Sequence, residues 1–495
     1  MNDITAGVNK LKIGQKKHIG FGDGDSLDEV PSRPSGNLAT ESHDTPHCPD
    51  EVPFRPPGNL AAKLHDTPRY LFRVFSDASA GENSSECMKS ADAVDKTLKS
   101  VDAVDKTFED IFARDPFTVA LTLNEHLRWL PKRSYGDPFI SWTTSLLVAI
   151  QYAIYKHKTE HKTEPEPAEL STISLCIVDT TLFPNGVFMK DLDLIEKFHG
   201  KVPDDYPVID NKGDPSTWGK RGLDNMRDLR TKLFNGYIGV YYFGEYLSQG
   251  QTNIEGRSCT VTCDKIINSN LFAFMPQFED ELKDESLLWA NAVIKLRQPF
   301  YFKKQKEMKD SDFSKATIIA LKFDTAWFLP MLANLLALSP RMARDPTIIG
   351  RILEHFRDEV IHHLLPKVTN VVANDNIPEV LHFGKIIHGI SEDYYAKSVA
   401  ELMSSMGKTT GASLATNCDR IGYQSTFPNA NTSISTIDII RHFIRDSGTA
   451  GGRKMLGTGD LATYLPTVDH SYVQPLMRSL ETLSGILQEL QEDTT

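Results

Sequence analysis

The stretch DPFISWTTSLLVAIQYA, residues 137–153, joins a strand pattern to a helix pattern without a gap. A short apolar run enters the hydroxyl-rich segment SWTTS, and apolar residues at helical spacing follow it. One hydroxyl is enough to cap a helix, because it satisfies the free N–H groups of the first turn, and Thr144 or Ser145 has the right position. The junction therefore predicts a strand that runs directly into a helix, with Ser141 and Thr143 left for another purpose.

Strand and helix patterns alternate from residue 69 onward, and from about residue 280 only amphipathic helices follow. The chain has 495 residues, of which 40% are apolar and 24% charged, which is enough for two or three globular domains. We predict an α+β fold, with a mixed domain at residues 69–277 and a mainly helical domain at residues 278–495.

A tandem repeat occupies much of the N-terminal segment. The unit DEVPSRPSGNLATESHDTP begins at Asp28 and returns, 22 residues later, as DEVPFRPPGNLAAKLHDTP from Asp50. Two proline-rich copies cannot bury a continuous core, since stacked repeats generally need at least about three. We therefore predict a disordered leader over residues 1–68. A second duplication at residues 90–109 is rich in helix formers and predicts a surface helix inserted into the first domain.

Charge and hydropathy exclude two classes of partner. The formal net charge is −12, and nucleic-acid binding requires a basic face, so no nucleic-acid partner is expected. The N-terminal residues lack an apolar core of signal-peptide length. The most apolar later stretch is broken by Lys322, Asp324 and Pro330, so no membrane span is predicted.

The six cysteines are scattered, and only Cys259 and Cys263 lie close together, without the second pair that a structural zinc site needs. One predicted helix carries His355, Glu359 and His362 on one face, but a single helix supplies too few ligands for a closed metal site. We expect no metal, reduced thiols and a cytoplasmic location.

Two charged residues interrupt apolar strand patterns. Arg73 lies in YLFRVFS among apolar and aromatic neighbours, and Glu245 lies near the end of YIGVYYFGEYLSQG. A guanidinium in such a strand requires an anionic partner. Three interpretations are open: Arg73 and Glu245 form a buried ion pair, they merely flank a packed sheet, or both belong to a ligand site together with SWTTS.

The order of an arginine, a hydroxyl-bearing strand and a glutamate resembles the nicotinamide-dinucleotide site of the ADP-ribosyltransferase fold. The segments that carry it are LFRVFS, FISWTTSLLVAIQYA and GEYLSQG. Residues 69–277 resemble, more closely, a fungal domain family of unknown function that is similar to a divergent member of that fold. The resemblance implies a split-sheet domain and NAD as a substrate, with ADP-ribose passing to a protein acceptor or to water.

The resemblance also implies a role for each residue. Glu245 would be catalytic and would stabilise the oxocarbenium-like ribose of the transition state, and Ser141 would hold its carboxylate in place. Arg73, Thr143 and Tyr152 would bind the dinucleotide, Arg73 through its planar fork of donors. We expect Arg73, Ser141 and Glu245 to converge at the edge of one cleft, with Arg73 and Glu245 on the same face of the sheet.

The sequence departs from the family pattern at two positions. Trp142 stands in the middle of the usual Ser-Thr-Ser, and Phe243 stands two residues before Glu245, where arginine-modifying relatives carry Glu or Gln. An apolar ring cannot orient an incoming guanidinium, so we expect water or a non-arginine acceptor. The alternative is a catalytically inactive fold that acts as an intracellular protein-interaction module.

Overall fold

The computed structural model describes residues 48, 51–98, 108–130, 136–160, 169–209, 213–232, 241–283, 289–342, 352 and 376–387. All of them belong to one compact unit that begins at Cys48. The first repeat copy and the segment around His355, Glu359 and His362 lie outside the described residues.

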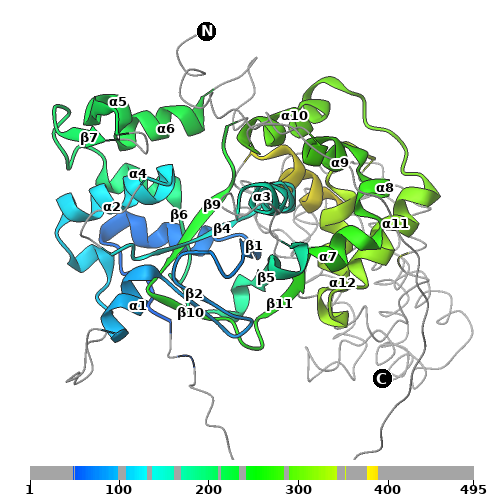
Figure 1. The fold of residues 1–495 in the computed structure, drawn as a ribbon, viewed down its shortest axis with the longest axis horizontal. Helices are drawn as coiled ribbons and strands as arrows, with labels where there is room; N and C mark the ends of the chain where they lie inside the picture. Colours follow the sequence, from blue (N-terminus) through cyan, green and yellow to red (C-terminus); the bar gives the residue numbers. More distant parts are fainter. Residues whose placement is uncertain are drawn as a thin grey trace, which may run out of the picture. The chain divides into compact units, whose positions relative to one another are not determined.

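A six-stranded antiparallel sheet is the centre of this unit (Figure 1). The strand order is β11-β5-β1-β4-β9-β6, so strands far apart in the sequence are neighbours. The strands are β1 (Tyr70–Phe75), β4 (Phe139–Thr143), β5 (Ser174–Asp179), β6 (Met189–Lys190), β9 (Glu245–Gln249) and β11 (Ser258–Thr262). Two smaller sheets are formed by β2 (Glu82–Asn83), β3 (Cys87–Lys89) and β10 (Gln251–Asn253), and by β7 (Pro207–Ile209) and β8 (Pro215–Thr217).

The large sheet opens between β1 and β4. Strand β1 pairs with β5 along its whole length, but it pairs with β4 only where Phe72 lies opposite Thr143. Strand β4, in contrast, pairs continuously with β9 from Phe139 to Thr143. The opening leaves space beside Ser141, whose carbonyl accepts from Arg73 Nη1 instead of from a neighbouring strand.

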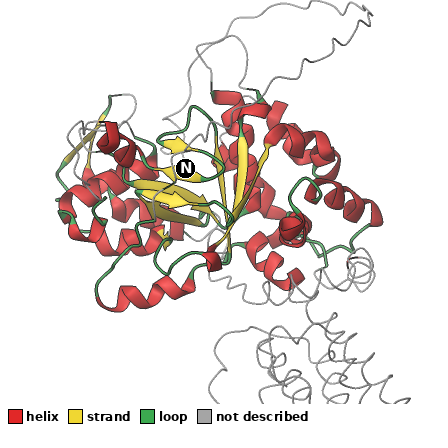
Figure 2. Ribbon diagram, turned by 90° about the horizontal axis from the view of Figure 1, so that it is seen from below, coloured by secondary structure: helices red, strands yellow, loops and turns green. Residues whose placement is uncertain are grey.

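Helices lie on both sides of the sheet (Figure 2). One group packs around α3 and continues into the C-terminal helices: α3 (Leu146–Thr159), α7 (Cys263–Ile266), α8 (Phe272–Phe274), α9 (Pro276–Lys283), α10 (Trp289–Phe302), α11 (Asp310–Ala320), α12 (Thr325–Leu336) and a helix at 378–387. The other group is α2 (Pro116–Arg128), α4 (Asp191–Phe198), α5 (Trp218–Arg221) and α6 (Leu223–Thr231). Both groups flank the opening between β1 and β4.

The predicted strand-to-helix junction is confirmed. Strand β4 ends at Thr143 and α3 begins at Leu146, and the Ser145 hydroxyl caps the helix by accepting from the Val148 N–H at 3.2 Å. Strand alternation explains Trp142: its ring is 1% exposed and packs edge-on against Phe188, on the face opposite Ser141 and Thr143.

The predicted mixed region followed by a helical region is also confirmed, but the described helices share their core with the sheet. One hydrophobic cluster runs from β1 and β5 through α3 to α11, α12 and the helix at 378–387. The C-terminal helices therefore complete the sheet's own core rather than enclosing another. No helix among the described residues has the length and apolarity needed to cross a bilayer.

The second repeat copy differs from the predicted leader, because it packs against the fold. Phe54 is 2% exposed and its N–H donates to the Gly186 carbonyl at 2.7 Å, and a 3₁₀ helix, Gly58–Asp66, follows. Cys48 forms a disulfide with Cys87 of β3, so the expectation of reduced thiols is wrong for this pair. Three others, Cys176, Cys259 and Cys263, are free and buried. The first copy of the duplication at residues 90–109 forms the predicted helix, α1 (Ala91–Leu98).

Candidate functional site

A cavity of about 660 Å³ lies where β1, β4, β9, α2, α3 and α6 meet. Its volume is in the range of small-molecule sites, about 300 to 1,000 Å³. All five residues predicted from the sequence line its wall: Arg73, Ser141, Thr143, Tyr152 and Glu245. The structure thus brings the five residues together on one cavity wall, and their roles stay predictions.

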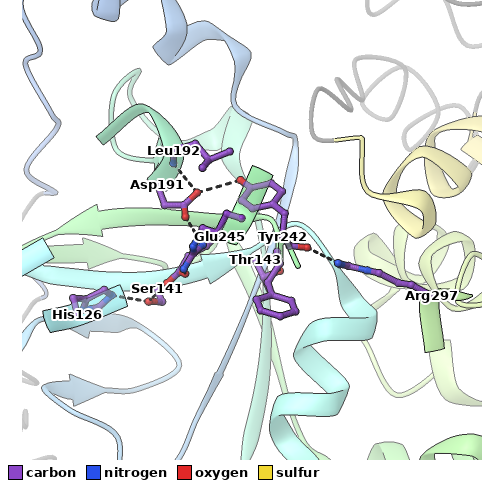
Figure 3. A network of polar contacts seen from close by, with 10 residues as sticks. His126, Ser141, Thr143, Asp191, Leu192, Tyr242, Glu245 and Arg297 are labelled. Carbon is purple, nitrogen blue, oxygen red and sulfur yellow. Dashed lines mark hydrogen bonds and ion pairs between the residues drawn. The ribbon is translucent and has the colours of Figure 1, made fainter. Parts of the chain in front are cut away.

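Glu245 is held at both carboxylate oxygens. The Ser141 hydroxyl donates to Oε1 at 2.8 Å, and Nη2 of Arg230 donates to Oε2 at 2.7 Å (Figure 3). Glu245 starts β9 opposite Thr143, so its side chain emerges on the same face of the sheet as Ser141 and Thr143. The side chain is 17% exposed, which leaves the carboxylate fixed but open to the cavity.

Arg230 of α6 links Glu245 to a second acid. Its other nitrogen, Nη1, contacts Asp191 at the start of α4, and Asp191 also accepts from the Tyr242 hydroxyl at 3.2 Å. Burial opposes the charge of Arg230, but Asp191 and Glu245 outweigh it and raise the pKa of the guanidinium. Arg230 is therefore a permanent cation that ties two helices to the strand bearing Glu245.

Ser141 is also hydrogen-bonded on its other side. Nε2 of His126 lies 2.7 Å from the Ser141 hydroxyl, and Nδ1 of the same ring lies 2.8 Å from Oδ2 of Asp137. Figure 3 shows His126, Ser141 and Glu245 in one row, with Asp191 and Tyr242 beyond Glu245. A continuous polar chain thus runs from Asp137 along the cavity wall to Glu245 and Arg230, and ends at the buried Asp191.

Arg73 lies differently from the expectation. Phe72 is opposite Thr143, so strand alternation puts Arg73 on the face opposite Ser141 and Glu245. Its guanidinium still lines the cavity, because the sheet opens there: Nη1 donates to the Ser141 carbonyl and Nη2 to Oδ1 of Asn83, both at 2.8 Å.

These contacts exclude one interpretation of Arg73. Among the described residues no carboxylate contacts its guanidinium, so the buried Arg73–Glu245 ion pair is not formed. Burial lowers the pKa of Arg73 to about 10, which leaves it charged at neutral pH. Arg73 therefore brings an uncompensated positive charge to the cavity.

Thr143 and Tyr152 have less freedom to bind a ligand. The Thr143 hydroxyl donates to the Phe243 carbonyl at 2.6 Å and accepts from the Ser145 N–H at 3.1 Å, so it closes the turn between β4 and α3. Tyr152 of α3 lies in an aromatic cluster with Trp129 and Trp289, whose rings stack at 5.3 Å. Burial raises the pKa of Tyr152 to about 12, so its hydroxyl stays protonated.

The C-terminal helices hold the loop before Glu245. Arg297 of α10 donates to the Tyr242 carbonyl (Figure 3) and forms a buried ion pair with Glu379 at 2.7 Å. Glu379 also accepts from the Ser145 hydroxyl at 2.5 Å. Gly244 has a φ of +67°, and a Cβ there would lie 2.2 Å from the Thr144 hydroxyl, so only glycine fits between this loop and α3.

Sequence reasoning missed four members of this site: His126, Asp137, Asp191 and Arg230. Asp137 and His126 had a weak signal, since both flank the strand that was singled out, and His126 follows Asn124 and Glu125 in an otherwise apolar helix. Asp191 and Arg230 lie on ordinary amphipathic helices and had none. No group of three or more His, Cys, Asp or Glu residues in the described part of the chain is arranged to hold a metal ion.

Comparison with known proteins gives a family match for part of the chain. A domain of unknown function (DUF7587) matches residues 66–208, which confirms the expected likeness to a domain family of unknown function. The matched segment includes Arg73, His126, Asp137 and Ser141 and ends before Glu245. No curated protein and no solved structure matches the chain.

Proposed function

We propose that the cavity binds NAD and cleaves the bond between nicotinamide and ribose, with ADP-ribose passing to water or to a non-arginine acceptor. The observation that carries the proposal is the carboxylate of Glu245, which is fixed by Ser141 and Arg230 on the wall of a ligand-sized cavity. The arrangement resembles the ADP-ribosyltransferase site in its order of arginine, serine and glutamate.

A fixed carboxylate at Glu245 suits the cleavage of a bond between nicotinamide and ribose. Cleavage of the glycosidic bond leaves positive charge on the ribose ring, as in glycoside hydrolysis. A carboxylate that is already oriented stabilises that charge without reorganising at the moment of reaction. The uncompensated charge of Arg73 suits a phosphate or ribose oxygen of the dinucleotide, with its planar donors pointing across the opening in the sheet.

Asp137, His126 and Ser141 also match the orienter, base and nucleophile of acyl-transfer enzymes. We do not assign that chemistry, because Glu245 lies 2.8 Å from the Ser141 oxygen. Attack by Ser141 on a carbonyl would create an oxyanion beside this carboxylate, where hydrogen-bond donors are required instead.

The test is to mix the purified chain with NAD and measure nicotinamide release by chromatography. Wild-type protein should release nicotinamide, and Glu245→Gln should not. Glu255→Gln is the matched control, since Glu255 is an exposed glutamate in the turn after β10, outside the cavity. Absence of release by the wild type over a range of NAD concentrations would remove the proposal.

The second candidate is a protein that binds NAD without cleaving it and serves as an interaction module. One observation favours it: both oxygens of Glu245 already have partners, one of them the permanent cation Arg230. A neutralised carboxylate stabilises an oxocarbenium less well. Saturable NAD binding by calorimetry, without nicotinamide release, would support this candidate over the first.

A further inference from the structure

The hydroxyl of Ser141 has one proton and two acceptors within reach. Oε1 of Glu245 lies at 2.8 Å and Nε2 of His126 at 2.7 Å. A neutral imidazole with a free lone pair on Nε2 would compete with Glu245 for this proton. The competition ends when Nε2 is itself protonated, because the ring then donates to Ser141 and the serine proton goes to Glu245.

Asp137 determines which form of the ring fits. A carboxylate only accepts hydrogen bonds, so Nδ1 of His126, 2.8 Å from Oδ2, must carry a proton. Asp137 is itself fixed, since its Oδ1 accepts from the Phe139 N–H at 3.0 Å. With Nδ1 protonated, the imidazolium is the form in which every contact of the chain has one donor and one acceptor.

We infer that His126 is a positioning residue: as an imidazolium oriented by Asp137 it donates to Ser141 and directs the serine proton onto Glu245. The inferred proton arrangement stands on the three contacts alone. Its importance for turnover rests on the proposed function, in which Glu245 faces the ribose. The site then includes His126 of α2, an element from which the sequence predicted no site residue.

Other charged groups near the His126 ring also affect whether it is protonated. Besides Asp137 and Glu245, the cavity wall carries Glu125 and Glu160 as acids and Arg73, Arg128, Lys156 and Arg230 as cations, and Lys156 pairs with Glu160. Arg230 is neutralised by Asp191 and Glu245, whereas Arg73 and Arg128 act against a further positive charge. The protonation form of His126 must therefore be measured directly.

The first experiment reads that form by NMR on the full chain with ¹⁵N-labelled histidine. The signals of His126 are those lost in His126→Gln. At pH 7 the wild type should show two protonated ring nitrogens, and Asp137→Asn should convert the ring to the neutral form. Ser248→Ala is the control, because that hydroxyl bonds Trp142 and Thr252 on the other face of the sheet. A neutral ring in the wild type, or no change in Asp137→Asn, would overturn the inference.

The second experiment uses nicotinamide release. His126→Phe removes the donor and should lower kcat by about 10- to 100-fold, the loss expected for one charge-assisted hydrogen bond, with KM changed less than about twofold. His126→Gln keeps an N–H donor that does not titrate, so it should lose less than about threefold and show no decline as the pH rises through the range where imidazole deprotonates.

A double variant separates positioning from other effects. If His126 acts through Ser141, then His126→Phe combined with Ser141→Ala should be no slower than Ser141→Ala alone. Multiplicative losses would overturn the inference. Failure of the proposed function has a different signature: the wild type releases no nicotinamide, while the NMR measurement still decides the form of His126.

Discussion

Ser141 and Glu245 form a diagonal contact across two paired strands. In the register of β4 and β9, Ser141 lies opposite Leu247 and Glu245 lies opposite Thr143, yet the serine hydroxyl reaches Oε1 of Glu245 at 2.8 Å. The glutamate side chain therefore leans forward along its own strand, toward the level of Leu247 and the middle of β4. This orientation places the carboxylate inside the cavity instead of at the sheet's end.

Glu245→Gln should abolish nicotinamide release and leave the melting temperature within a few degrees of the wild type. The amide is nearly isosteric: its oxygen can accept from Arg230 and its NH₂ can donate to Ser141, but it has no charge for the oxocarbenium. A nicotinamide-release assay checks the loss of activity, and thermal unfolding of the same variant checks that stability is retained. A variant that retains wild-type turnover would show that Glu245 is not the reacting carboxylate.

A small guanidine compound should not become labelled when it is offered together with labelled NAD. The face of Phe243 is occupied, since its ring lies 4.7 Å from Trp289 and the guanidinium carbon of Arg297 is 5.9 Å from its centre. An incoming guanidine thus has neither a hydrogen-bond acceptor nor a free ring at this position. Efficient labelling that depends on Glu245 would contradict this view of Phe243.

Arg297→Met should destabilise the protein by about 3 to 5 kcal/mol, the usual cost of leaving one member of a buried ion pair alone. Arg297 and Glu379 have side chains 0% and 3% exposed. Lys283→Met is the control: Lys283 pairs with Glu279 on the surface at 69% and 46% exposure, and its loss should cost at most about 1 kcal/mol. Urea unfolding of the three proteins measures the difference, and equal midpoints for both variants would contradict the prediction.

Stability should fall in mild acid because of His382. Burial lowers the pKa of His382 to about 4, below the 6.5 expected for the unfolded chain, so unfolding takes up a proton between these values. The stabilisation is complete above pH 6.5 and is lost as the pH falls toward 4, by about 3 kcal/mol. Melting temperatures from pH 7 to 4.5 should decline less steeply in His382→Gln than in the wild type. His65→Gln, at an exposed position, should follow the wild-type curve.

The strand-to-helix junction could be predicted because it depends on a local signal, whereas the expectation of a shared site came from the family resemblance. Hydroxyls ahead of a helical pattern identify a cap, and interrupted apolar strands point to Arg73 and Glu245 as special. The face occupied by Arg73 could not be predicted, since it follows from the single pairing of Phe72 with Thr143 and the opening beside it. Strand pattern alone gives alternation within a strand, not the register between strands.

The residues that contact the predicted site residues could not be predicted from the sequence either. Arg230 and Asp191 come together because α4 and α6 pack against each other. The residue pattern of one helix does not show which residue of another helix it will contact. A helical C-terminal part was predicted from its apolar periodicity and is seen in the described residues, but such a pattern does not say which surface the helices will cover. Here that surface is the sheet's own core.

The second repeat copy and the residues just before it are held by contacts that the first copy and its preceding residues lack the side chains to reproduce. Phe54, buried against Phe112, corresponds to Ser32, and Cys48, bonded to Cys87, corresponds to Ser26. Loss of a buried phenylalanine costs about 3 kcal/mol or more, which is roughly a hundredfold in occupancy. After the duplication the two copies are therefore not equivalent, because the side chains that anchor residues 48–66 to the fold have no counterpart in the first copy.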